Sequence, residues 1–500
     1  MMKYLLSAVG VLVLLLGLLY ALLFTTPGNG YLQPVIESKI AEKVPLPVKL
    51  QTFLLRPDRF DIVLKIGDDT TIEAKGSMNL FAQSLDASYN LDIKELSTLQ
   101  KLIGTRLNGP FKTEGTVKGD STFMKIEGKS DVAKSATTYS LDLVEFEPQK
   151  ALAKVSHMQI DALLYMLNQP NYARGSIDIE ARAANLDPDD LDGRVVTAVR
   201  DGVLHPDPVK KDFNLSIPSD LTFKGDIETL LKGSEAISKA EFVTSVATLA
   251  SKAVTYNIEK GSLATDYTLK VPDLDKLFFL TNQHMKGDIT VTGNVESSKK
   301  GLRATAHSNT LGGVVEALFE NGIADVKVRN IQTVALTDML LYPHIFDSRA
   351  NIKLNYDTLK ELGTLHAELL NGQILPNKMS FMLQQMANFD ITKEVYERTV
   401  IDTKIVKKRL ISDLYMKSRL TEIKSKKALV DFEKQSIDAT LEIKLRKMML
   451  PVILKGDLTS PKIKIETKAL LKSKAKEEIE KHIPENLKDS PAGELLKGLF

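Results

Sequence analysis

Histidine and acidic side chains are the first candidates for chemistry, because none of the 500 residues is cysteine. The histidines show none of the HxH, HxxxH or HExxH spacings that hold zinc. They lie at positions 157, 205, 284, 307, 344, 366 and 482. The acidic stretch NLDPDDLDG (185–193) departs from the ligand register of a calcium loop, whose closing glutamate would fall on Ala198. We interpret it as a polar turn.

Motifs for other chemistries do not occur in the expected context. There is no GxSxG and no P-loop, and no GxGxxG stands between a strand and a helix. The chain lacks the usual features of a nucleic-acid-binding protein. Its net charge is only +2, it contains no tryptophan, and 6% of its residues are aromatic, so it has little positive charge for phosphates and few rings to stack on bases. We therefore predict a protein that is not an enzyme, with no catalytic residue, no metal site, no cofactor and no nucleic-acid partner.

The triplet Lys-Gly-Asp occurs four times, beginning at Lys118, Lys224, Lys286 and Lys455. Each copy follows an apolar residue and stands beside an alternating stretch. A glycine-containing turn or strand entry explains this pattern, so we predict strand boundaries rather than an adhesion motif.

Alternation of apolar and polar residues dominates the chain after its first 50 residues. Examples are FDIVLKI (60–66), YSLDLVEF (139–146), GSIDIEARA (175–183), DITVTGNV (288–295), ATLEIKLRK (439–447) and KIKIE (462–466). Such alternation places every second side chain on the same face of a strand. The sequence therefore predicts a mainly β body of antiparallel strands with one apolar and one wet face.

An internal repeat interrupts the strands, since VSHMQIDALLYMLNQP (155–170) and VRNIQTVALTDMLLYP (328–343) align without a gap. Each copy predicts a short amphipathic helix, with Leu163, Met166 and Leu167 or Leu336, Met339 and Leu340 on one face. Weaker copies begin at 91–103 and 271–280, which favours a degenerate solenoid-like array. A helix duplicated inside one globular domain is the alternative. Further helices are expected near 227–253, 379–397 and 468–482.

The N-terminal run Tyr4–Phe24 contains 21 uncharged, mostly apolar residues, enough to cross a bilayer as a helix. It lacks the small-x-small exit of a cleavable signal, so we predict an uncleaved anchor. Lys3 precedes the run and the next basic residue is Lys39, which predicts a cytoplasmic N-terminus and an exported body. The predicted parts are an anchor (1–25), a β body (26–466) and a C-terminal helical tail (467–500).

The anchor, the VxxxQxxALxxML repeats, the phrase NFDITKE (388–394) and the closing LPVILKGDLTSPKIKIETKALL resemble the AsmA-like proteins of Gram-negative bacteria, the AsmA, TamB and YhdP type. The closing stretch matches best, with an apolar strand (452–454), Gly456, Pro461, a second strand (462–466) and a helix from Lys468. The resemblance implies a long twisted sheet curled into an open groove, anchored in the inner membrane and lying in the periplasm. It also implies passage of glycerophospholipids toward the outer membrane and support of outer-membrane integrity.

A groove of this kind needs apolar side chains that replace the bilayer around acyl chains. The candidate lining residues are Leu141, Leu143, Ile177, Ile179, Ile289, Val291, Leu441, Ile443, Leu445, Ile463 and Ile465. Two alternatives stay open. The same face could pack on helices as an ordinary core, and the protein could be a scaffold or assembly factor for outer-membrane proteins that uses its sheet edges and termini.

Overall fold

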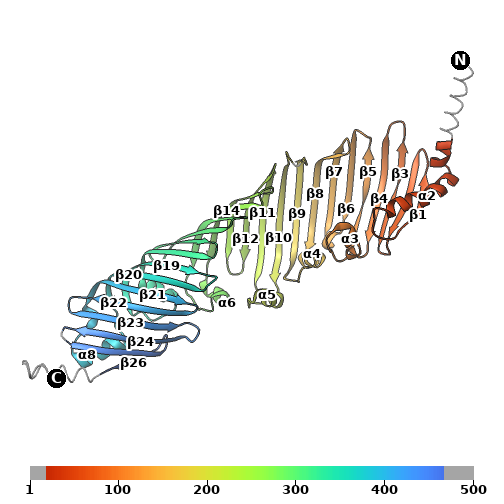
Figure 1. Cartoon of the computed structure of the whole chain (residues 1–500). Helices are drawn as coiled ribbons and strands as arrows, with labels where there is room; N and C mark the ends of the chain where they lie inside the picture. The colour runs from red at the N-terminus through yellow and green to blue at the C-terminus, as the bar shows by residue number, and fades with distance from the viewer. Residues whose placement is uncertain (1–17, 188, 447, 467–500) are drawn as a thin grey trace, which may run out of the picture. The chain divides into compact units, whose positions relative to one another are not determined.

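The computed structural model describes residues 18–187, 189–446 and 448–466 (Figure 1). The fold is mainly β, as predicted, and the described residues form 26 strands with short helices between them. Contacts within the chain divide it into two compact units, Met1–Thr265 (unit 1) and Asp266–Phe500 (unit 2).

Unit 1 is an antiparallel meander, in which each strand pairs with the strands before and after it in the sequence. Its strands are β1 (Val48–Leu55), β2 (Arg59–Ile66), β3 (Thr70–Asn79), β4 (Ser84–Ile93), β5 (Phe111–Gly119), β6 (Phe123–Ser130), β7 (Ala136–Val144), β8 (Glu147–Gln159), β9 (Ala173–Asn185), β10 (Asp192–Leu204), β11 (Thr222–Lys232), β12 (Glu235–Thr244) and β13 (Thr248–Asn257). Its helices are α2 (Thr26–Ala41), η1 (Leu96–Leu99), α3 (Gln100–Ile103), η2 (Val132–Lys134), α4 (Ile160–Met166) and α5 (Pro206–Phe213). Strand β14 (Ser262–Val271) contains the boundary between the units.

Unit 2 continues as a second antiparallel meander. Its strands are β15 (Ile289–Ser298), β16 (Gly301–Thr310), β17 (Gly313–Glu320), β18 (Ile323–Gln332), β19 (Phe346–Asp357), β20 (Leu362–Ile374), β21 (Val395–Val406), β22 (Arg409–Lys417), β23 (Thr421–Asp431), β24 (Ser436–Leu445), β25 (Met448–Asp457) and β26 (Lys462–Ile465). Its helices are η3 (Leu274–Leu277), α6 (Phe278–Thr281), α7 (Thr333–Met339), α8 (Lys378–Ala387) and η4 (Ile391–Lys393).

The helices between strands all lie at the same end of the strands in each unit. Successive connections of an antiparallel meander alternate between the two ends of its strands. In unit 1 the helical connections follow β4, β6, β8 and β10, and in unit 2 they follow β14, β18 and β20. All of these strands are even-numbered, so the helical connections share one end of the strands. We call this row of strand ends the helix edge. The opposite row of strand ends, where connections are short, is the hairpin edge. Figure 1 shows α3, α4 and α5 at the same ends of the unit 1 strands.

The buried cores lie at the helix edge. In unit 1, Leu96 and Leu99 of η1 pack with Ile66, Ile93 and residues of α4. In unit 2, α8 and η4 cover the last strands, where Leu383, Ile391, Ile443, Leu450 and Val452 are completely buried. The helical connections therefore supply the packing that an isolated sheet face lacks.

The repeat predicted from the sequence is a shared local structure. Helices α4 and α7 confirm the two strong copies, and the helical turns η1–α3 and η3–α6 occupy the two weak ones. In each unit, the segment that follows the weak copy is hydrogen bonded to the helix of the strong copy at the same place. The amide of Asn108 donates to the Met166 carbonyl in unit 1, and that of Lys286 donates to the Met339 carbonyl in unit 2.

β-Bulges with a common hydrogen-bond pattern change the strand register at three places, two near the helix edge in β8 and β18 and one in the middle of β23. The bulged residues His157, Asn330 and Lys427 have φ values of 56°, 57° and 54°, in the left-handed region. Each donates its backbone N–H to an acidic or amide side chain of the neighbouring strand, from Asp178, Asn351 and Asp413 respectively, at 2.8–3.0 Å. The side chain of the partner strand thus satisfies the amide that leaves the ladder.

Several predicted elements differ from the structure. No helix forms over 227–253, which contains parts of β11 to β13; along β11 the residues alternate between half-buried and exposed, with Ile227 and Leu231 half-buried and Leu230 exposed. Lys224–Asp226 lies inside β11 rather than at a strand boundary, whereas two other copies of the triplet end β5 and β25. The helix predicted over 379–397 ends at Ala387, and the one predicted over 468–482 lies outside the described residues.

The N-terminal helical segment packs on the first strand. Residues 18–24 are helical, and α2 follows after Thr25. The Asn29 side chain accepts a hydrogen bond from the Leu55 amide and donates to the Leu55 carbonyl at 3.1 Å, so it pairs with β1 as a neighbouring strand would. Among the described residues, no helix combines the length and the apolar composition that a membrane span requires. Most of the predicted anchor, residues 4–17, lies outside them.

Replacing Leu383 by alanine tests the packing of α8. This side chain is 0% exposed, so Leu383→Ala should lower the free energy of unfolding by about 2–5 kcal/mol. Faster hydrogen exchange in β21–β25 would report the loss, because these strands share its core. Phe381→Ala, on the same helix but 62% exposed, is the control and should leave the exchange rates unchanged. Equal effects of both substitutions would contradict this packing.

Candidate functional site

One face of the unit 1 sheet is apolar across nine consecutive strands, from β2 to β10. The strand registers align one residue of each strand in a continuous row. One row consists of Phe60, Gly76, Ala87, Val117, Ile126, Leu141, Ala151, Ala183 and Gly193. The next consists of Ile62, Ala74, Tyr89, Gly115, Gly128, Tyr139, Ala153, Ala181 and Val195. Neither row contains a charged residue, and each spans roughly 40 Å at the usual strand spacing. We call this surface the apolar face.

The apolar face remains partly accessible away from the helix edge. All nine residues of the row through Tyr89 are half-buried, whereas Ile66 and Ile93, which pack with η1 and α4, are 7% and 5% exposed. The middle of the face therefore presents apolar side chains to whatever lies next to it. Such a continuous apolar surface on a protein commonly marks a binding site.

The opposite face of the same strands is charged and solvated. The register that lies between the two apolar rows aligns Asp61, Lys75, Ser88, Thr116, Glu127, Ser140, Leu152, Arg182 and Arg194. Exposed ion pairs join neighbouring strands, among them Lys129 with Glu114 at 2.7 Å and Arg194 with Glu228 at 2.8 Å. We call this surface the polar face.

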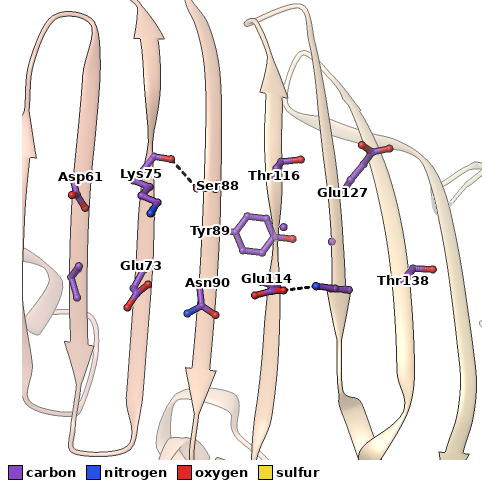
Figure 2. A pocket seen from close by; sticks show the side chains of 15 residues that line it. Asp61, Glu73, Lys75, Ser88, Tyr89, Asn90, Glu114, Thr116, Glu127 and Thr138 are labelled. Carbon is purple, nitrogen blue, oxygen red and sulfur yellow. Dashed lines mark hydrogen bonds and ion pairs between the residues drawn. The ribbon is translucent and has the colours of Figure 1, made fainter.

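A shallow hollow of about 840 Å³ lies over the polar face from β2 to β7 (Figure 2). Figure 2 shows Glu73, Lys75, Glu114 and Glu127 around it, and the ion pair of Glu114 crosses it. A second hollow, of about 610 Å³ in unit 2, contains Lys353, Asp413 and a hydrogen bond of 2.7 Å between His366 and Asp402. The charged side chains around both hollows suit water better than an apolar ligand.

Two tyrosines cross the apolar face above a pair of glycines. The hydroxyls of Tyr89 (β4) and Tyr139 (β7) lie 2.6 Å apart, and Thr113 hydrogen bonds to Tyr139. Gly115 and Gly128 are opposite each other on the two strands between them. A Cβ atom on Gly128 would lie 2.5 Å from the Tyr89 hydroxyl and 2.6 Å from the Tyr139 ring, so only glycine leaves room for this bridge.

Burial is the main cause that raises the pKa of Tyr89 above the usual value for a phenol, and the hydrogen bond with Tyr139 adds to it. The phenol therefore stays neutral at physiological pH. Thr113 in turn donates to the Lys129 carbonyl at 3.1 Å, so the three hydroxyl hydrogens can all find acceptors within the protein. The bridge adds hydroxyls to the apolar face without adding a charge or an unpaired donor.

Unit 2 carries an apolar face of the same kind. One row aligns Ala304, Phe319, Ala324, Tyr356, Gly363, Ile405, Leu410, Val430, Ile437 and Gly456. Tyr267 lies over Gly293 and donates to the Thr305 carbonyl at 2.9 Å, which parallels Tyr89 over Gly115. Towards the helix edge this face is covered, because α8 and η4 lie over β20 to β25.

The structure separates the lining residues expected from the sequence into two groups. Leu141, Leu143, Ile177 and Ile179 in unit 1, and Ile289, Val291 and Ile463 in unit 2, are half-buried. Leu441, Ile443, Leu445 and Ile465 are buried in the core that α8 covers, with exposures of 9%, 0%, 4% and 8%. For these four residues, the open alternative of packing under a helix describes their surroundings.

Sequence reasoning missed the tyrosine bridge and the glycines below it. Tyr89 and Tyr139 lie 50 residues apart, so only the strand registers bring them together. A signal was present, however, because Gly115 and Gly128 each occupy the apolar phase of an alternating strand, where a larger apolar residue is usual.

Within the described ranges, no group of three or more histidine, aspartate or glutamate side chains is arranged to hold a metal ion. No protein-family model matches this sequence, and a search of curated proteins finds no match.

Placing a methyl group under the bridge tests its geometry. Gly128→Ala should displace Tyr89 or Tyr139 and lower the free energy of unfolding by about 1–3 kcal/mol, the usual cost of overpacking. Gly30→Ala is the control, because nothing lies within 4 Å of its added Cβ and its helix α2 favours alanine. Chemical denaturation of both variants provides the measurement. Unchanged stability of the Gly128 variant would refute the close approach of the tyrosines.

Proposed function

We propose that the protein carries phospholipids, with their acyl chains on the apolar face and their headgroups in water. The single observation that supports this most strongly is the pair of nine-residue rows in unit 1, which are free of charge, aligned across nine strands and still partly accessible. No nucleophile or cofactor is needed, because the protein only replaces the surroundings of the lipid tail.

The free energy of burying methylene groups favours a long apolar chain as the ligand. Burial of each methylene group contributes about 0.8 kcal/mol, so an acyl chain gains from every strand that it crosses. The rows repeat similar side chains at each strand, which gives successive positions of similar free energy. A lipid can therefore shift along the face without crossing a large barrier, as transport requires.

The covered part of unit 2 limits the proposed lipid-binding surface. Ile443, Leu450 and Val452 are completely buried beneath α8 and η4, and an acyl chain cannot reach them without displacing the helix. We place the lipid on the apolar face of unit 1 and on the half-buried rows of unit 2, such as the one through Tyr356. The part of the last strands that α8 and η4 cover is then a packed core that does not bind lipid.

We further propose that the chain is an AsmA-like protein, anchored in the inner membrane by residues 4–24, with its β body in the periplasm. In this role it moves glycerophospholipids toward the outer membrane and supports outer-membrane integrity. The antiparallel sheet with interspersed helices is compatible with that family, and the apolar N-terminal run supports the anchor.

Photo-crosslinking within cells tests lipid carriage directly. A photoreactive residue at Ile126 or Leu141 should form phospholipid adducts, because both side chains belong to the apolar face and are half-buried. The matched controls are Glu127 and Asp142, the next residues along the same strands, which belong to the polar face. Mass spectrometry of the crosslinked protein identifies the adducts.

Equal adduct yields at Ile126 and Glu127 would contradict the proposal, because the two residues face opposite sides of the sheet. Protein adducts at Ile126 in place of lipid would favour the alternative function, a scaffold for outer-membrane proteins.

A further inference from the structure

Exposed apolar side chains gather on three adjacent hairpins at the hairpin edge of unit 1. Phe81 is 102% exposed on the β3–β4 hairpin, Phe123 is 46% exposed beside the β5–β6 turn, and Phe146 is 63% exposed on the β7–β8 hairpin. Leu80 and Val144 extend the group, at 49% and 42%. We call Phe81, Phe123 and Phe146 the phenylalanine tips.

Hydrogen bonds between the turns hold the three hairpins side by side. The Ser121 hydroxyl donates to the Gln83 side chain at 2.9 Å, which links the first two hairpins. The Glu145 amide donates to the Thr122 carbonyl at 3.0 Å, which links the second and third. The three tips therefore lie on neighbouring hairpins whose turns are tied together.

The N-terminal helical segment reaches the same edge. The turn between β1 and β2 belongs to the hairpin edge, and Arg56 in this turn donates to the Phe24 carbonyl and to the Thr26 hydroxyl, both at 2.7 Å. The preceding residues Leu18, Leu19 and Tyr20 are 64%, 51% and 54% exposed. They are the last part of the uncharged run Tyr4–Phe24, so the most apolar segment of the chain enters unit 1 at the edge that carries the phenylalanine tips.

We infer that the hairpin edge of unit 1 docks on a phospholipid bilayer, with the phenylalanine tips inserted at the boundary between headgroups and acyl chains. Phenylalanine is favourable at this depth because its ring leaves water while the hairpin backbone stays hydrogen bonded. A bilayer, rather than a second copy or another protein, is the expected occupant, because the residues that meet this edge are the last part of a sequence run of 21 uncharged residues, a length suited to a membrane.

Docking in this orientation brings the strand ends of the apolar face to the membrane surface. The row from Phe60 to Gly193 lies towards the hairpin edge, and Leu141 in this row is followed on the same face by Leu143, next to the β7–β8 turn. An acyl chain could leave the bilayer beside the tips and enter the face without crossing the charged residues of the polar face. Docking itself does not require lipid carriage.

Depth-dependent fluorescence quenching tests the inference with the full chain. The sequence contains no cysteine, so Phe81→Cys, Phe123→Cys and Phe146→Cys can each carry a single environment-sensitive nitrobenzoxadiazole label. The proteins are reconstituted in nanodiscs of phosphatidylethanolamine and phosphatidylglycerol that contain nitroxide-labelled lipid. Each label should show blue-shifted emission and quenching by the nitroxides. Phe213→Cys is the matched control, since Phe213 is 65% exposed on α5 at the helix edge, and its label should remain in water.

A second variant separates docking from local effects of the label. Phe81→Asp together with Phe146→Asp should abolish quenching of a label at position 123, whereas Phe213→Asp should leave it unchanged. Labels at the tips that are quenched no more than the label at 213 would overturn the inference. Blue-shifted emission without quenching by lipid nitroxides would also overturn it, since it indicates a protein partner. Quenching reports docking and photo-crosslinking reports bound lipid, so either proposal can fail without the other.

Discussion

The two-residue alternation of β-strands, kept in register across many strands, is the constraint on which the structure depends. A slip of one residue between two neighbours would move apolar side chains to the polar face and break both rows. The strand register is adjusted at the helix edge by β-bulges. Bulged residues such as His157 and Asn330 take left-handed conformations, and their backbone amides donate hydrogen bonds to the side chains of Asp178 and Asn351. These bulges adjust the register next to the inserted helices. Further shifts lie near the hairpin edge, between β7 and β8 and between β9 and β10, and the two apolar rows nevertheless remain continuous.

The same arrangement separates stability from accessibility. At the helix edge, η1, α4 and α8 supply buried cores that hold the strands, with side chains such as Leu99 and Leu383 at 5% and 0% exposure. Away from that edge, the apolar side chains are only half-buried, and the charged residues of the opposite face keep the sheet hydrated. The surface that we propose for lipid binding can therefore remain open while the helix edge carries much of the folding free energy.

The features that could be predicted from the sequence are those that leave a pattern within one short segment. Alternating stretches such as 60–66 and 175–183 identified strands, and the repeat at 155–170 and 328–343 identified α4 and α7, because each pattern reports a single element. The helix expected over 227–253 was wrong, since these residues form parts of β11 to β13. The cover that α8 places over Ile443 and the tyrosine bridge over Gly128 depend on contacts between residues far apart in the sequence, which no local period encodes.

A cryo-electron microscopy map of the full chain in nanodiscs tests the central proposal most directly, because it shows what occupies the apolar face of unit 1. We expect elongated density that follows the rows through Ile126 and Tyr139, with none between α8 and the strands that it covers. Density of a second chain or of residues 467–500 packed over these rows would contradict the proposal, since the face would then be a protein interface.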